Sequence, residues 1–188
     1  MNIRQIDKKD IPAVALLHKQ SFDKTHFTAF FSTELLSRYI KVLIDYNPYS
    51  YLAEEGDRIL GYLIGGNKTG AALDNFSKNN YLKIILTLLL HPGFILEKIQ
   101  SVLLKINKVK ISEVEYKIYI IASLPEAQGK GIGRALMNTF ENELRIKGIK
   151  EYGLSVREQN NNAISFYENN NFIRINKIHK SLYYKKIL

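Results

Sequence analysis

Apolar positions in the first part of the chain follow a strand-like alternation and then two helical spacings. Residues 2–6 alternate as in a strand, Asp10 with Pro12 is typical of a helix start, and Ser32 is placed to cap a second helix. The apolar positions with helical spacing are Val14, Leu16, Leu17 and Phe22, followed by Leu35, Leu36, Tyr39, Ile40, Leu43 and Ile44. Two short apolar runs, 49–54 and 58–65, are separated by the polar turn Glu55-Gly56-Asp57, which predicts a β-hairpin.

The second part of the chain predicts a strand over 114–123, a helix from a glycine-rich turn to about Lys147, and a strand over 151–157. A short helix through Tyr167 and two closing strands complete the pattern.

Residues 67–110 do not fit this order of strands and helices and are predicted to form a helical insertion. The apolar runs 81–90 and 94–108, separated by His91-Pro92-Gly93, predict two helices of unequal length. Neither run approaches the ~20 apolar residues that span a bilayer. We expect a helical hairpin that covers the substrate end of a site or a subunit interface, as in a homodimer. A core extension and reversible contact with a membrane surface are the alternatives.

Composition favours a single domain over residues 1–188, because 46% hydrophobic residues can supply a core for a chain of this length. The sequence has no cysteine, which excludes disulfides and cysteine nucleophiles, and its 4 histidines lack metal-ligand spacing, so no metal is expected. The polar N-terminus does not resemble a signal peptide, which favours the cytoplasm. The net charge of +9 favours anionic partners. The sequence has no recognisable nucleic-acid reading motif, so nucleic acid is not expected among them.

The stretch 121–134 carries the clearest chemical signal. A strand-like run stops at Pro125, and Gly129, Gly131 and Gly133 then open a helix. Without a Cβ the backbone can approach a ligand closely, and the unpaired N–H groups of a helix start can bind a pyrophosphate. The stretch lacks the Gly-Lys-Ser/Thr ending of a P-loop and the third glycine of a dinucleotide fingerprint. It matches Gln/Arg-x-x-Gly-x-Gly at Gln128, Gly131 and Gly133.

This pattern resembles the acyl-CoA signature of the GCN5-related N-acetyltransferase (GNAT) family. Residues 160–172 are similar to a second element of that family, Asn-x-x-Ala-x-x-x-Tyr-Glu-x-x-Gly-Phe, with Asn171 in place of its glycine. Asparagine is the non-glycine residue that best tolerates a left-handed helix end. The resemblance is strong over 116–172 and rests on element order before that.

The resemblance implies an α/β fold, of the α+β kind. The central sheet is expected to be mixed and mostly antiparallel, with a V-shaped splay between two strands and helices on both faces. The insertion would precede the strand that binds acetyl-CoA.

The resemblance also implies an acyltransferase that moves an acetyl group from acetyl-CoA, its co-substrate, to a primary amine by direct transfer in a ternary complex. Tyr167 is the expected general acid, and the main-chain amides of Ala122 and Ser123 would polarise the thioester carbonyl. Glu115 is the candidate base, with Tyr119, His26 or a water chain as alternatives. The residues expected to bind acetyl-CoA are Ile121, Ala122, Ser123, Gln128, Gly129, Lys130, Gly131, Ile132, Gly133, Arg134, Asn160 and Tyr167.

The amine acceptor is less defined by sequence. Aromatic side chains at the expected acceptor end suit sugars, aromatic amines and hydrophobic peptides alike. They are Phe27, Phe30, Phe31, Tyr46, Tyr49, Tyr183 and Tyr184. The insertion is similar to that of relatives that act on amino sugars, which implies a small-molecule acceptor. A protein or peptide N-terminus as acceptor, and a non-catalytic acyl-CoA sensor, are the alternatives.

Overall fold

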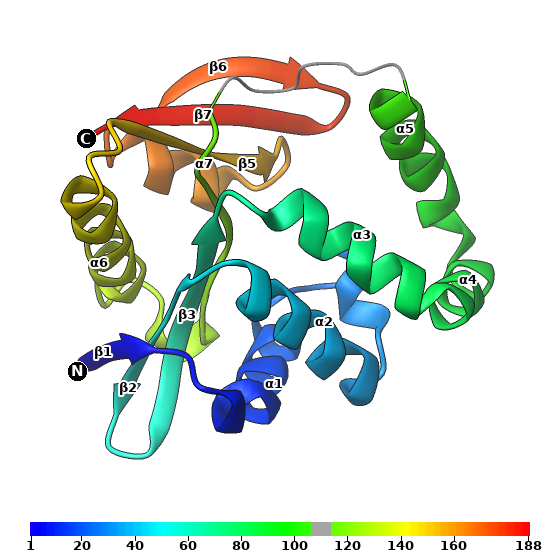
Figure 1. Ribbon diagram of the computed structural model, residues 1–188, viewed down its shortest axis with the longest axis horizontal. Coiled ribbons are helices and arrows are strands. Elements are labelled where there is room, and N and C mark those ends of the chain that lie inside the picture. The colour runs from blue at the N-terminus through cyan, green and yellow to red at the C-terminus, as the bar shows by residue number, and fades with distance from the viewer. Residues whose placement is uncertain (107–113) are drawn as a thin grey trace.

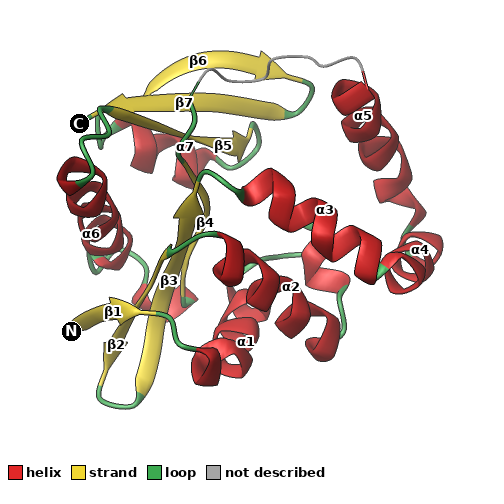
Figure 2. Cartoon of the chain, viewed as in Figure 1, coloured by secondary structure: helices red, strands yellow, loops and turns green. Residues whose placement is uncertain are grey.

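A single mixed sheet with helices packed around it forms the body of the protein in a computed structural model that describes residues 1–106 and 114–188 (Figures 1 and 2). In these residues seven strands pair in the order β1-β2-β3-β4-β5-β7-β6. The strands are β1 (Asn2–Gln5), β2 (Tyr49–Glu55), β3 (Arg58–Gly66), β4 (Lys117–Ser123), β5 (Glu151–Arg157), β6 (Ile173–Ile178) and β7 (Ser181–Ile187). All neighbours are antiparallel except β4 and β5, which are parallel. This arrangement confirms the predicted fold class.

The predicted hairpin forms β2 and β3, with Glu55 opposite Arg58 across the turn. Gly56 takes φ +59 in this turn, a left-handed conformation that favours glycine. The predicted strand at 114–123 begins later than expected, because the register with β3 starts only at Lys117.

Helices cover both faces of the sheet. They include α1 (Ile11–Ser21), α2 (Thr33–Tyr46), α6 (Ile132–Ile146) and α7 (Asn161–Glu168), with short 3-10 turns η1 (Lys8–Asp10), η2 (Phe27–Phe30) and η4 (Pro125–Ala127). Consecutive residues of a strand point to opposite faces. A Cβ at Gly65 would meet Phe140 of α6, whereas one at Gly66 would meet Asn47 at the end of α2. Figure 1 shows the same division, with α6 on one side of β3 and α1 and α2 on the other.

The two predicted helix starts are stabilised in different ways. Ser32 caps α2 as expected, since its Oγ accepts a hydrogen bond from the Leu35 N–H at 3.2 Å. Asp10 occupies the N-cap position of α1, but its carboxylate is engaged elsewhere. It accepts hydrogen bonds from Arg4 at 2.6 and 2.9 Å and from the Asp7 N–H at 2.8 Å. The Arg4 guanidinium therefore lowers the pKa of Asp10.

The apolar stripe of α6 anchors this helix to the sheet. Leu136, Met137, Phe140 and Leu144 recur at helical spacing and are fully buried. Burial of each such side chain contributes ~1.5–3 kcal/mol. The stripe therefore fixes the N-terminus of α6 relative to β4.

The insertion forms three helices within the described residues, α3 (Thr69–Asn79), α4 (Tyr81–Leu90) and α5 (Ile95–Ile106), with a 3-10 turn η3 (Pro92–Phe94). The predicted helix over 81–90 is confirmed, and the predicted end of the next helix at Lys108 lies outside the described residues. Helix α3 was not predicted, because its apolar residues are few and only Ala72 and Phe76 among them are buried. The assignment of residues 1–188 to one domain stays a prediction.

A V-shaped gap separates β4 from β5. Their register holds a single pair, Lys117 with Gly153, and the Gly153 N–H donates to the Tyr116 carbonyl at 2.9 Å. Beyond this point the strands diverge, so the carboxyl ends of both, at Ser123 and Arg157, face an open space. Among residues 1–106 and 114–188, no helix is both long enough and apolar enough to cross a membrane.

Candidate active site

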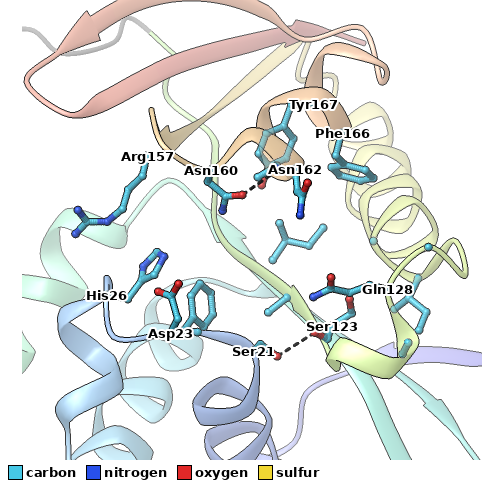
Figure 3. Close-up of a pocket in the computed structure, with 18 of the residues that line it drawn as sticks. Ser21, Asp23, His26, Ser123, Gln128, Arg157, Asn160, Asn162, Phe166 and Tyr167 are labelled. Atoms are coloured by element: carbon cyan, nitrogen blue, oxygen red, sulfur yellow. Dashed lines mark hydrogen bonds between the residues drawn. The ribbon is translucent and has the colours of Figure 1, made fainter.

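A cavity of about 860 Å³ occupies the gap between β4 and β5. We call it the central cavity. Its walls come from the carboxyl ends of β4 and β5, the start of α6, helix α7 and the loop after α1 (Figure 3). Every residue predicted to bind acetyl-CoA lines this cavity except Lys130, which lies in the same turn with an exposed side chain. The structure thus brings together two sequence segments that are separated by α6.

The glycine turn forms the start of α6 by adopting left-handed backbone conformations. Gly129 has φ +76 and Gly131, the N-cap of α6, has φ +80. Other residues adopt these angles only at a cost of roughly 1–2 kcal/mol. The first turn of α6, which includes Gly133 and Arg134, borders the cavity with N–H groups that lack partners within the helix. The helix dipole and Arg134 make this end of the cavity favourable for an anion.

Gly133 is required for close packing between α6 and α7. A Cβ at this position would approach Phe166 Cζ to 3.3 Å, so glycine lets α7 pack closely against α6. Arg134 strengthens the same junction, since its Nε donates to Asn170 Oδ1 at 3.2 Å. Asn170 in turn donates through Nδ2 to the Phe166 carbonyl at 2.7 Å.

The edge of β4 that faces the gap presents main-chain groups. Leu124 N–H donates to the Leu60 carbonyl on β3 at 2.9 Å. Because N–H directions alternate along a strand, the N–H groups of Ile121 and Ser123 point away from β3 and toward the gap, whereas Ala122 faces β3. The N–H and carbonyl groups of one strand residue point to the same side. The Ser123 carbonyl also points away from β3, because it accepts a hydrogen bond from Ser21 Oγ at 3.0 Å. The N–H groups that face the gap are therefore those of Ser123 and Ile121, whereas the expected pair was Ser123 and Ala122.

Tyr167 lines the cavity from the last turns of α7. Its ring lies 5.4 Å, centroid to centroid, from both Phe166 and Phe172. Burial raises the pKa of the Tyr167 hydroxyl, so this group carries its proton at neutral pH and can act as a donor.

A left-handed helix end holds Tyr167 in place. Asn171 has φ +65, as the sequence predicted for this position. The Phe172 N–H donates to the Tyr167 carbonyl at 3.1 Å and the Asn171 N–H donates to the Glu168 carbonyl at 3.1 Å, which is the Schellman pattern. At the other end of α7, Asn160 Oδ1 accepts from the Ala163 N–H at 3.1 Å and caps the helix.

Ionisable residues cluster on the side of the cavity away from Gln128 and Phe166. Figure 3 shows Asp23, His26 and Arg157 gathered there. Thr25 donates to Asp23 from its N–H at 2.9 Å and from its hydroxyl at 2.5 Å, and these bonds lower the pKa of Asp23. Burial, aided by the charge of Arg157, lowers the pKa of His26. The His26 imidazole is therefore neutral near pH 7 and able to accept a proton.

The insertion reaches this side of the cavity through an ion pair. Arg157 donates to Glu97 of α5 through two hydrogen bonds of 3.0 Å each, and this contact lowers the pKa of Glu97. Phe94 and His91 of the insertion stack against Phe27 and Phe30 of η2, at centroid distances of 5.4 and 3.9 Å. The insertion thus packs against η2, which directly follows the loop that supplies Asp23 and His26.

Glu115 and Tyr119 lie outside the residues that line the central cavity. Glu115 stands six residues before Ile121, roughly 20 Å along an extended chain, and accepts a hydrogen bond from Asn67 Nδ2 at 2.7 Å. Tyr119 accepts one from the Tyr39 hydroxyl at 3.0 Å. The structure therefore does not bring Glu115 to the predicted site.

Sequence reasoning missed Asp23 and Arg157. A usable signal existed for Arg157, because it ends the strand that runs parallel to β4, and ligands bind at the carboxyl ends of parallel strands where their order changes. For Asp23 the signal was weak, since an Asp two residues before a Thr is also typical of an ordinary loop turn. Within the described residues, no group of three or more His, Asp or Glu side chains is arranged to hold a metal ion.

Comparison with known proteins agrees with this architecture. The family model described as acetyltransferase (GNAT) family matches residues 12–172. A mycothiol acetyltransferase of Geodermatophilus obscurus is 38% identical over 58 residues, which are 31% of this chain and 19% of the relative, so the match spans a minor part of that protein.

Solved structures give the same result for the fold. SsHAT superimposes with a TM-score of 0.73 at 18% identity, over 99% of this chain and 97% of that one. The PaiA N-acetyltransferase of Thermoplasma acidophilum, solved in complex with coenzyme A, gives a TM-score of 0.62 at 17% identity, over 100% and 98% of the two chains. With a family model that spans residues 12–172 and a sheet that splays at the expected strands, the chain belongs to the acetyltransferase (GNAT) family.

Proposed function

We propose that this protein transfers the acetyl group of acetyl-CoA to a primary amine by direct attack in a ternary complex. One observation carries the proposal. The central cavity joins a helix start whose first N–H groups lack partners within the helix, the gap-facing main-chain edge of β4 and the buried hydroxyl of Tyr167. A thioester with a pyrophosphate at one end and a reacting carbonyl at the other needs these three features together.

The acetyl-CoA half of the cavity lies between the start of α6 and α7. The pyrophosphate would accept hydrogen bonds from the N–H groups at the first turn of α6, close to Gly131 and Gly133. The thioester carbonyl would then lie against the gap-facing N–H groups of Ile121 and Ser123. These donors can stabilise the oxyanion that develops during attack, a contribution typically worth ~3–4 kcal/mol for each donor.

The transfer requires two proton movements. The amine nitrogen attacks the thioester carbonyl carbon, the carbon–sulfur bond breaks, and Tyr167 donates its proton to the departing thiolate. The amine must arrive neutral or lose its proton during attack. We assign His26 as the base that accepts the proton of the amine. Its side chain lines the cavity and its lowered pKa keeps the imidazole neutral, whereas Glu115 lies outside the cavity.

The acceptor would occupy the side of the cavity beside Asp23, His26 and Arg157. Asp23 supplies a negative charge for an ammonium group before its proton is removed. The insertion packs against η2, next to this loop, through the ring contacts of Phe94 and His91, and its Glu97 pairs with Arg157 of the cavity wall. A helical insertion beside this end of the cavity favours a compact acceptor over a polypeptide chain. We therefore propose a small amine, such as an amino sugar, as the acceptor.

Calorimetry with acetyl-CoA followed by a thiol-release assay against a panel of amines tests the proposal. We expect binding with a Kd on the order of tens of micromolar or tighter, and CoA release that depends on one class of amine. Absence of acetyl-CoA binding by the folded protein would contradict the whole proposal. Tight binding without amine-dependent release would instead indicate an acyl-CoA sensor.

CoA release that depends on peptides rather than on small amines would contradict the proposed acceptor class, but not acetyl transfer itself. The panel should therefore include amino sugars, simple diamines and short peptides with free N-termini.

A further inference from the structure

The last residue of α1 is hydrogen-bonded to the last residue of β4. Ser21 Oγ donates to the Ser123 carbonyl at 3.0 Å, and both residues line the central cavity (Figure 3). Among the described residues, β4 has no register pair on its gap side beyond Lys117 with Gly153. A main-chain carbonyl at such an open edge needs a partner from elsewhere. The Ser21 hydroxyl thus takes the place that a neighbouring strand would occupy.

The peptide group between Ser123 and Leu124 is held at both of its ends. Its carbonyl accepts from Ser21, and its N–H, which belongs to Leu124, donates to the Leu60 carbonyl on β3 at 2.9 Å. Because a peptide group is planar, these two bonds on opposite sides fix its orientation. The gap-facing N–H of Ser123 is separated from this plane only by the two backbone dihedrals of Ser123. Its direction therefore depends on the same two bonds.

The loop that supplies His26 to the cavity begins directly after Ser21. The far end of this loop is tied to the sheet as well. Thr28 Oγ1 lies 2.8 Å from His18 Nε2, and His18 Nδ1 lies 2.5 Å from the Tyr62 hydroxyl on β3. The loop is thus attached to the sheet at both ends, and Ser21 makes the attachment to the gap-facing edge of β4.

We propose that Ser21 is a positioning residue for acetyl transfer, whose hydroxyl sets the direction of the Ser123 N–H and the distance of His26 from the thioester. This inference rests on the proposed function, in which Ser123 stabilises the oxyanion and His26 accepts the proton of the amine. Both groups act at short range, and a displacement of about 1 Å can cost ~100-fold in rate. Loss of the Ser21 hydroxyl should therefore impair the chemical step rather than the binding of acetyl-CoA.

Ser21→Ala tests the inference, because it removes the hydroxyl and keeps the Cβ. We expect single-turnover acetyl transfer to slow at least about tenfold. The acetyl-CoA Kd from calorimetry should change less than about threefold, since the start of α6 is untouched. Ser21→Thr keeps the hydroxyl and should restore the rate of transfer to within about threefold of that of the unaltered chain.

Ser50→Ala is the matched control. Ser50 Oγ also donates to a main-chain carbonyl, that of Asn47 at 2.8 Å, but Ser50 is buried and does not line the central cavity. This variant should lose at least as much stability in urea denaturation as Ser21→Ala, because its hydrogen bond is the more deeply buried one. It should nevertheless keep the rate of acetyl transfer.

Three outcomes would overturn the inference alone. They are unchanged single-turnover transfer in Ser21→Ala, an equal loss of rate in Ser50→Ala, and no recovery of the rate in Ser21→Thr. Absence of transfer by the unaltered chain with every amine of the panel would contradict the proposed function, and the inference would fail with it.

Discussion

The position of Tyr167 is fixed by two neighbouring rings and by a left-handed turn of the chain. The rings of Phe166 and Phe172 hold the phenol, and the left-handed Asn171 turns the chain so that Phe172 reaches it. Removal of the hydroxyl should therefore leave the packing almost unchanged. Any effect of Tyr167→Phe can then be attributed to the lost proton donor.

We expect Tyr167→Phe to lower kcat by ~100-fold to 10,000-fold, the usual contribution of general acid catalysis, with little change in acetyl-CoA affinity. Single-turnover acetyl transfer measures the chemical step directly. Tyr184→Phe is the matched control, because its hydroxyl donates to Glu168 at 2.8 Å outside the central cavity and its removal should spare the rate. A chemical step that proceeds equally fast in Tyr167→Phe would reduce Tyr167 to a packing residue.

The buried His18 leads to a second prediction, on the pH dependence of stability. It is buried, with Nδ1 at 2.5 Å from the Tyr62 hydroxyl and Nε2 at 2.8 Å from the Thr28 hydroxyl, and burial lowers its pKa from 6.5 to about 4. Between these two values the unfolded chain binds a proton that the folded chain does not. The stability contributed by neutral His18 is thus complete above pH 6.5 and is lost as the pH falls toward 4.

From about pH 7 to about pH 5 this histidine should reduce the free energy of unfolding by ~2 kcal/mol. Urea denaturation at both pH values measures the change, and His18→Gln should flatten the pH dependence. Tyr62→Phe keeps the buried imidazole and should keep the slope. An identical slope in His18→Gln would show that other groups account for the acid sensitivity.

Among the elements, the turn before α6 offers the sharpest test of acetyl-CoA binding. Gly131→Asp and Gly131→Asn introduce side chains of nearly equal shape that both tolerate a left-handed φ, so strain is matched and charge is the difference. The carboxylate would lie at the helix N-terminus, where it would repel a pyrophosphate. We expect acetyl-CoA affinity to be at least about tenfold weaker in Gly131→Asp than in Gly131→Asn. Equal affinities in calorimetry would argue against a pyrophosphate at this turn.

The elements also show how far sequence reasoning reaches. The hairpin, α4, β5 and the Ser32 cap were predictable, because local patterns and turn chemistry determine them. The start of β4 was misplaced, since pairing with β3 decides it and pairing is not local. Helix α3 was missed because its sequence shows no clear helical stripe, and its position depends on packing of Phe76 against Phe31 and Tyr39. The proposed roles of Ile121, Asp23 and Arg157 depend on strand orientation and tertiary contacts, which no local motif encodes.

At the scale of the whole molecule, the ion pair between Glu97 and Arg157 joins the insertion to the sheet. Glu97→Gln would remove the negative charge, and the half-buried pair should account for up to ~1 kcal/mol of stability. We expect faster amide hydrogen exchange in α5 and unchanged exchange in α6. Asp45→Asn, which breaks an exposed pair with Lys41 within α2, is the control that should leave α5 unaffected. Unchanged exchange in α5 of Glu97→Gln would show that the ring contacts of η3 suffice to hold the insertion.

The single register pair between β4 and β5 also bears on the order of folding. Strands β1 to β4 pair with neighbours in sequence, and so do β6 and β7, whereas β4 and β5 meet only across α6. The join between β4 and β5 has one register pair, whereas β3 with β4 has six and β5 with β7 has seven, so this join gains far less stabilisation from strand pairing than either half-sheet. We therefore expect the two half-sheets to assemble first and the join between them last. Because the central cavity exists only where the halves meet, a partly folded chain would have its secondary structure before it has a site.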